Sequence, residues 1–169
     1  MSDPAPRMSD PEVRLRPVGP DDLEPLYELE SDVEGSHMIA FLPRTPGDRA
    51  AFDAHWARVT RDPDVRTWII EADDRFAGYA VSFLTGGERQ VGYWVVRDLW
   101  GQGIATAALR AVLEAVPERP LWGSTVADNA GSQRVLQKAG FVFVRTERSH
   151  APQRGAEVEE RVFRLDGRP

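Results

Sequence analysis

A glycine-rich turn is the part of this sequence whose residue types and spacing point most directly to chemistry. It reads Trp100-Gly101-Gln102-Gly103-Ile104 and separates a strand-like apolar run from an alanine-rich helical run. Glycines there let the backbone bend sharply and let a ligand touch it with no Cβ in the way. The free N–H groups of the first helical turn, at the positive end of the helix dipole, favour a phosphate. The turn is consistent either with phosphate binding or with a plain strand-to-helix connection.

Two familiar phosphate-binding motifs do not fit this turn. A Walker loop is excluded because no Gly-Lys-Ser or Gly-Lys-Thr follows the glycines. A dinucleotide fingerprint is excluded because Thr106 stands at the third glycine position and no ribose-binding acid is evident. The turn therefore needs a second feature before it identifies a ligand.

A second group of polar residues lies one predicted strand downstream. It begins at Asn129, has Ser132 three residues later, and ends at Gly140-Phe141. Together the two segments resemble the GNAT superfamily of N-acetyltransferases, and more narrowly its branch of ribosomal-protein N-terminal acetyltransferases of the RimJ/RimL type. In that branch a Trp-Gly-x-Gly-x-Ala-Thr stretch precedes Asn-x-x-Ser-x-x-Val-Leu-x-x-x-Gly-Phe. The resemblance covers about residues 13–165 of this chain.

The resemblance implies acetyl-coenzyme A as the cofactor, and no metal. In the family, the pyrophosphate lies on backbone amides at the start of the helix, and the pantetheine arm runs along the preceding strand like an added strand. Asn129 would meet that arm and Ser132 would lie near the sulfur. The cofactor-binding residues implied in this way are Trp94, Val95, Val96, Trp100, Gly101, Gln102, Gly103, Ile104, Ala105, Thr106, Asn129 and Ser132.

One position departs from the superfamily pattern. The residue three places before the first glycine is Asp98, where the superfamily has Gln or Arg. A carboxylate beside a pyrophosphate is unfavourable unless it points away, because the two charges repel. The neighbouring Arg97 could compensate for it.

Acetyl transfer to an amine requires a proton to leave the ammonium, polarisation of the thioester oxygen, and a proton for the departing thiolate. The chain has no cysteine, so an acetyl-cysteine route is excluded and direct attack in a ternary complex remains. A backbone N–H in the 93–96 strand would polarise the oxygen. The tyrosine that many superfamily members use as the acid is replaced by Leu136. Ser132, which the RimJ/RimL branch uses instead, is the candidate acid, although a serine in a first helical turn can equally bond backbone.

The base that accepts the ammonium proton is less clearly marked. In the RimJ/RimL branch a carboxylate on the strand after Gly-Phe has this part, and its aligned position falls near Ala151. The adjacent titratable residues, His150 and Glu147, are therefore the candidate bases. The alternatives are two carboxylates that would act through water, and one histidine in a loop bordering the acceptor pocket of relatives: Glu71, Glu88 and His37.

Alternating and helical apolar patterns predict the elements that must position these residues. We expect strands at about 13–18, 65–71, 76–84, 90–96, 121–126, 141–148 and 158–165. We expect helices over about 23–29, 48–59, 104–116 and 129–139, and a loop containing Gly35, His37, Pro43 and Pro46. A meander followed by a strand–helix–strand crossover indicates an α/β (α+β) fold of GNAT type. It would have a mixed, mostly antiparallel central sheet with helices on both faces.

The composition limits the remaining possibilities. A chain of 169 residues fits one domain over 13–169, after a polar, proline-rich tail over 1–12 that we expect to be disordered. The absence of cysteine excludes a disulfide framework and a zinc–thiolate site. The net charge of −6, with scattered basic residues, argues against nucleic acid as a partner. Apolar runs too short to span a membrane, and no signal-peptide pattern, favour a cytoplasmic protein without membrane contact.

The sequence thus predicts an acetyl-CoA-dependent N-acetyltransferase that moves acetyl to a primary amine. The acceptor is either a protein N-terminus, as the branch suggests, or a small amine. The resemblance also allows a homodimer. One alternative is a catalytically inactive CoA-binding sensor or interaction module, and another is a nucleotide- or phosphopeptide-binding domain that uses the glycine turn.

Overall fold

The computed structural model of the protein describes residues 10–43 and 45–167. Most of the tail predicted over 1–12 lies outside them. The strands are β1 Val13–Pro17, β2 Arg66–Ala72, β3 Arg75–Thr85, β4 Glu88–Val95, β5 Leu121–Val126, β6 Val142–Ala151 and β7 Ala156–Leu165. The α-helices are α1 Leu23–Ser31, α2 Val33–Ile39, α3 Arg49–Val59, α4 Ile104–Ala115 and α5 Ala130–Lys138. Short 3₁₀ turns cover Pro20–Asp22 and Arg97–Leu99.

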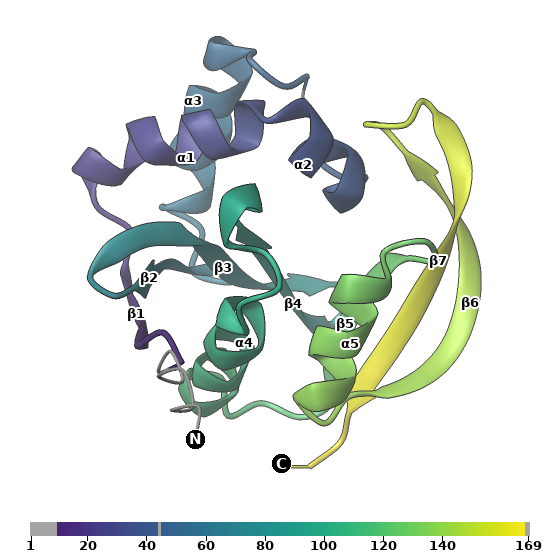
Figure 1. The fold of residues 1–169 in the computed structure, drawn as a ribbon. Helices are drawn as coiled ribbons and strands as arrows, with labels where there is room; N and C mark the ends of the chain where they lie inside the picture. The colour runs from purple at the N-terminus through teal and green to yellow at the C-terminus, as the bar shows by residue number, and fades with distance from the viewer. Residues whose placement is uncertain (1–9, 44, 168–169) are drawn as a thin grey trace, which may run out of the picture.

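All seven strands belong to one mixed sheet in the order β1-β2-β3-β4-β5-β7-β6 (Figure 1). Every neighbouring pair is antiparallel except β4 and β5, which the crossover helix α4 joins as a parallel pair. Only two positions pair across β4 and β5, Arg89 with Leu121 and Gln90 with Trp122. The sheet is therefore interrupted beyond these residues, along the carboxyl half of β4.

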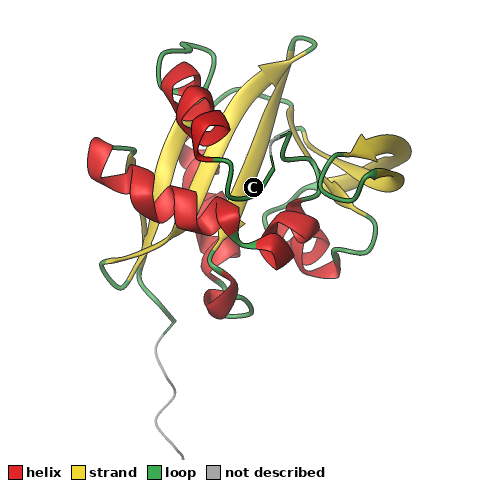
Figure 2. Cartoon of the chain, turned by 90° about the horizontal axis from the view of Figure 1, so that it is seen from above, coloured by secondary structure: helices red, strands yellow, loops and turns green. Residues whose placement is uncertain are grey.

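Helices cover both faces of the sheet, as the sequence predicted (Figure 2). Neighbouring strand residues point to opposite faces, and β2 shows this at Ile69 and Ile70, which are both fully buried. Ile70 packs in the cluster that contains Leu109 of α4, whereas Ile69 packs with Phe52 of α3. The predicted mixed α/β sheet with helices on both faces is confirmed.

The one missed helix is α2, in the segment predicted as a loop around Gly35 and His37. Asp32 caps it, with its side chain accepting a hydrogen bond from Gly35 N. The helix ends at its C-cap residue Ala40, which has a positive φ of 64°. A helix of seven residues with an internal glycine shows too little periodicity to be recognised in sequence.

Among the residues that the structure describes, no helix is both long and apolar enough to cross a membrane.

Candidate functional site

Two cavities meet where β4 and β5 part. The first, about 670 Å³, lies between the glycine turn, the start of α4 and the start of α5. The second, about 550 Å³, is lined by α2, α3 and the residues of β3 and β4 that face them. Six residues, which we call the junction, line both cavities: Met38, Ile39, Tyr93, Trp94, Asn129 and Ser132. The molecule can therefore bring two ligands to one place from opposite sides.

The glycine turn forms one wall of the first cavity. Gly101 and Gly103 have φ of 76° and 79°, which disfavours other residues, and a Cβ built on either would meet no atom within 4 Å. The Trp100 indole donates a 2.8 Å hydrogen bond to the carbonyl of Val95, which fixes the turn against the end of β4. The first residues of α4 also line the cavity, namely Ile104, Ala105 and Thr106. Open space over an exposed helix N-terminus suits an anion.

The open edge of β4 forms a second wall. Trp94 and Val95 are buried and line the first cavity. Beyond Gln90, β4 has no pair with β5 among the described residues. An extended ligand arm can therefore lie along this edge as an added strand would.

Two predicted cofactor contacts do not line the first cavity. Val96 donates its backbone N–H to the carbonyl of Ala77 over 2.8 Å, and Gln102 turns its side chain back to the carbonyl of Asp98. The remaining ten predicted cofactor residues do line it.

The expected compensation of Asp98 by Arg97 is not what the structure shows. Arg97 forms ion pairs with Asp32, at 3.4 Å, and with Glu34 at the start of α2. Its guanidinium is thus committed to α2, and Asp98 is exposed outside the cavity.

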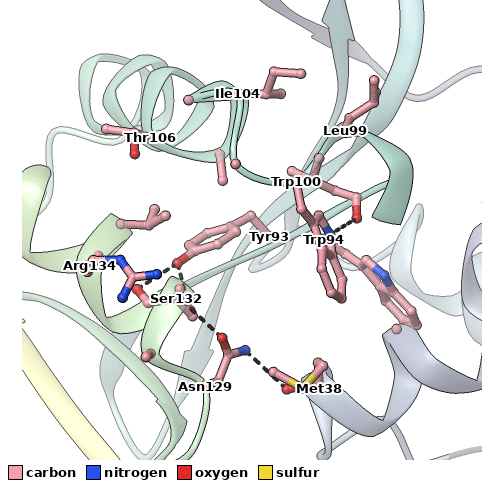
Figure 3. A pocket seen from close by; sticks show the side chains of 18 of the residues that line it. Met38, Tyr93, Trp94, Leu99, Trp100, Ile104, Thr106, Asn129, Ser132 and Arg134 are labelled. Atoms are coloured by element: carbon pink, nitrogen blue, oxygen red, sulfur yellow. Dashed lines mark hydrogen bonds between the residues drawn. The ribbon is translucent and has the colours of Figure 1, made fainter.

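Two cations that sequence reasoning missed line the first cavity instead. Arg134 and Lys138 lie one turn apart on α5, and Figure 3 shows Arg134 on the helix that faces Thr106 of α4. Residues four apart share a helix face. That spacing, and the fact that Lys138 is the chain's single lysine, was the available signal.

A hydrogen-bonded chain of side chains occupies the junction (Figure 3). The Tyr93 hydroxyl lies 2.8 Å from Ser132 Oγ, and either group can donate. Asn129 Oδ1 accepts from Ser132 N over 3.0 Å, and Asn129 Nδ2 donates to the carbonyl of Met38 over 3.3 Å. Two hydroxyls therefore stand side by side between the cavities, held to α5 and α2.

Burial raises the pKa of the Tyr93 phenol to about 12, although its hydrogen bond to Ser132 works in the other direction. The phenol, which is protonated near neutral pH at either its ordinary or its raised pKa, can pass a proton to or through Ser132. Sequence reasoning considered Tyr93 only for its backbone. The signal that could have found its side chain was its place two residues before Val95, on the same face of a strand that borders the cofactor turn.

The two predicted bases are not brought to either cavity. Glu147 is paired with Arg145, and His150 Nδ1 lies 3.7 Å from Glu157. Both side chains are exposed on β6, one of the two edge strands of the sheet. Ala151, the aligned carboxylate position, is buried. The prediction followed sequence proximity to that position, whereas the pairing of β6 with β7 directs these two side chains elsewhere.

The alternative bases lie in three different places. Glu71 accepts from Arg16 over 2.6 Å, near the β1 edge of the sheet. Glu88 is exposed at the start of β4, and His37 contributes its carbonyl to a bond from Arg154. None of these three lines a cavity, but His55 of α3 lines the second one.

The second cavity is mainly aromatic and aliphatic. Apart from the junction residues, its polar side chains come from α3 and the segment after it and from three strands: His55, Arg58, Asp62, Thr67, Gln90, Ser124 and Thr125. Among the described residues, no group of three or more His, Cys, Asp or Glu could hold a metal ion.

A sheet parted between two parallel strands, with a glycine turn and helix N-terminus beside the gap, defines the class of acyl-CoA-dependent N-acyltransferases. The family model for the acetyltransferase (GNAT) domain matches residues 12–142, which is most of the chain. The protein therefore belongs to the GNAT acetyltransferase family. No protein of curated function matches the sequence.

Solved structures share the fold at low sequence identity. RimJ of Mycobacterium smegmatis, in complex with a CoA-disulfide, is 23% identical, with 92% of this chain and 82% of that one covered and a TM-score of 0.77. RimL, a ribosomal L7/L12 α-N-protein acetyltransferase in complex with coenzyme A, is 15% identical, with 91% and 93% covered and a TM-score of 0.78. Spermidine N-acetyltransferase from Vibrio cholerae, with CoA and spermine, is 12% identical, with 91% and 95% covered and a TM-score of 0.78.

Proposed function

We propose that the protein is an acetyl-CoA-dependent N-acetyltransferase in which acetyl-CoA fills the first cavity and a primary amine enters the second. The observation that carries this proposal is the junction, because the two cavities share Tyr93 and Ser132. Two reactants that approach from opposite faces can then meet in one ternary complex, and holding them in place lowers the barrier to reaction.

The residues of the first cavity fit coenzyme A. The amides of the turn and of the start of α4 would hold the pyrophosphate, since both glycines leave open space over them. Arg134 and Lys138 would add positive charge across the cavity, and the edge of β4 at Trp94 and Val95, which does not pair with β5, would hold the pantetheine arm. Bound there, acetyl-CoA supplies an activated acetyl thioester.

The chain's own residues would provide the proton and charge chemistry at the junction. Ser132, hydrogen-bonded to the neutral Tyr93 phenol, would deliver a proton to the departing sulfur. A backbone N–H near Trp94 would stabilise charge on the thioester oxygen. His150 and Glu147 lie outside both cavities, so we propose no direct part for them.

The acceptor is either a protein N-terminus or a small amine. RimL, which acts on a ribosomal protein, supports the first, and the spermidine acetyltransferase supports the second. The RimJ/RimL-like motif around the glycine turn and Asn129 favours the N-terminus. A ribosomal acceptor would place the enzyme in the cytoplasm. The homodimer stays a prediction.

The test measures thiol release from acetyl-CoA with a panel of peptides and small amines, beside calorimetric binding of CoA. We expect amine-dependent release, and we expect Ser132→Ala to lower kcat by about 100-fold with little change in CoA affinity, in the range usual for loss of a general acid. If CoA binds but no amine gives turnover, and Ser132→Ala changes nothing, the protein is a CoA-binding sensor and the proposal is wrong.

A further inference from the structure

Ser124 is the one exposed residue of β5, whose other five residues are buried. It lines the second cavity together with Asn129 and Ser132. Gly92, which lies two residues past the last paired position of β4, lines the same cavity. The one exposed hydroxyl of β5 therefore faces the space assigned to the acceptor, since the hydroxyl-bearing neighbour Thr125 is buried.

The Ser124 hydroxyl is fixed by a carboxylate on the neighbouring strand. Its Oγ donates to Glu160 Oε1, and Ser149 Oγ of β6 donates to Glu160 Oε2 over 2.6 Å. Each carboxylate oxygen is thus held by one serine. Glu160 forms no ion pair with a described residue, unlike Glu147, which is paired with Arg145, and Asp128, which is paired with Arg154.

This arrangement decides which kind of group Ser124 can bind. A serine hydroxyl has one hydrogen and two lone pairs, and an ionised carboxylate can only accept. Because Ser124 donates its hydroxyl hydrogen to Glu160, it can only accept a hydrogen bond from a group in the cavity. A donor such as an ammonium is therefore favoured there, and the negative charge of Glu160, which has no ion-pair partner among the described residues, strengthens that preference.

We propose that Ser124, oriented by Glu160, is the group that receives the acceptor's ammonium in the second cavity. The inference rests on the proposed function, in which this cavity takes the amine. Ser124 is a specificity residue that touches the acceptor, and Glu160 and Ser149 are positioning residues that fix the direction of its hydrogen bond.

The experiment compares Glu160→Gln and Ser124→Ala with Glu159→Gln as the matched control. Glu159 is the exposed neighbour on β7, and its backbone carbonyl accepts from Ala127 N, just after β5. We measure KM for the amine, kcat, and the affinity for CoA. Glu160→Gln and Ser124→Ala should each raise the amine KM about 10-fold, as loss of a hydrogen bond to a charged group implies. CoA affinity and the Glu159→Gln values should stay at wild-type levels.

Substitutions at Ser149 separate a positioning role of Glu160 from an effect on folding. Ser149→Ala should raise the amine KM less than Glu160→Gln does. Ser149→Thr should leave the amine KM near its wild-type value, since threonine keeps the hydroxyl that holds Glu160 Oε2. Calorimetric binding of the amine to the CoA complex should show the same order without turnover.

Failure of the proposed function and failure of the Ser124 assignment would give different results. If wild-type protein acetylates no amine, the proposed function fails and Ser124 is not at issue. If the wild type is active but Glu160→Gln and Ser124→Ala leave the amine KM and affinity unchanged, the assignment of Ser124 is overturned while the function stands.

Discussion

At the scale of single residues, the Tyr93 phenol carries the largest consequence of burial at the junction. Its pKa rises to about 12 in the folded protein, from an ordinary value of 10.0 that the unfolded chain would show. Between these values the unfolded state releases a proton that the folded state keeps. The free energy of unfolding should therefore be unaffected by Tyr93 below about pH 10 and should fall as pH rises from 10 to 12.

This pH dependence predicts a difference between Tyr93→Phe and the wild type. The variant has no phenol to ionise, so its stability should decline less steeply over the same alkaline range. Urea unfolding at several pH values measures the slopes, and Tyr27→Phe is the control, since it removes a hydroxyl of α1 that donates to the carbonyl of Gly47. If the free energy of unfolding falls equally steeply in Tyr93→Phe and in the wild type, the pKa of Tyr93 is not raised in the folded protein.

The pair of hydroxyls predicts a kinetic result as well. Because Tyr93 and Ser132 share one hydrogen bond, they should act on one proton path. Groups that act as a unit give non-additive losses. Tyr93→Phe and Ser132→Ala combined should cost about as much kcat as the more damaging single change, and a double-mutant cycle measures this. Fully additive losses would show that the two hydroxyls work independently.

At the scale of elements, Asn129 joins the start of α5 to the end of α2. Its side chain caps α5 through Ser132 N and reaches the carbonyl of Met38. Asn129→Ala should lower the free energy of unfolding by about 1 kcal/mol, a typical cost for a lost N-cap. In a protein of this size that lowers Tm by roughly 2–4 °C. Asn129→Ser keeps a capping oxygen, so thermal unfolding should show most of the loss recovered.

Gly78 sets how closely β3 approaches β4 beside the cofactor edge. It has a φ of 148°, and a Cβ there would lie 2.0 Å from the Trp94 carbonyl oxygen. Because that atom is backbone, a strand would have to move, and Gly78→Ala should cost on the order of 3 kcal/mol or lower Tm by roughly 10 °C. Gly86→Ala is the control, since Gly86 also has a positive φ but a Cβ there meets nothing within 4 Å. Equal losses in both variants would mean that the conformation, and not the collision, is responsible.

The sequence predicted the elements well where local patterns decide them. The β2–β3–β4 meander, β5 and the caps of α3 and α5 depend on alternation, turns and the side chains of Asp48 and Asn129, all of which are local. α2 was missed because a short helix held by Asp32 has no such period.

The candidate site was predictable only where it lies on local motifs. The glycine turn and the Asn129–Ser132 segment could be recognised because each is continuous in sequence. The parting of β4 from β5, which makes Tyr93 a junction residue, depends on how two distant strands pair. The same is true of Glu160, whose serine partners come from β5 and β6. Contacts between strands of this kind leave no spacing signal in one sequence.

At the scale of the whole molecule, the proposed function requires a protein with a net negative charge to bind coenzyme A, which is itself a polyanion. In the proposed complex the net charge of −6 would repel coenzyme A at long range, whereas Arg134 and Lys138 would attract it inside the first cavity. Salt screens the distant repulsion first, since the Debye length is about 30 Å at 0.01 M and about 8 Å at 0.15 M, and contacts at short range are screened less. The two effects should largely cancel, so the Kd for CoA in the wild type should change little between these salt concentrations.

Removing the charges of Arg134 and Lys138 should leave the long-range repulsion of CoA without the local attraction that opposes it. In Arg134→Gln/Lys138→Gln only the repulsion and the neutral backbone contacts remain, so binding at 0.01 M salt should weaken about 10-fold, as for two lost charge-assisted contacts from exposed side chains. Added salt should then strengthen binding. Arg61→Gln/Arg148→Gln removes the same charge from exposed sites outside both cavities, so it should raise the long-range repulsion alone. Calorimetric titration with CoA at three salt concentrations measures all three proteins. If both double variants respond to salt alike, the cations on α5 do not contact the cofactor, and net charge alone sets the electrostatics of binding.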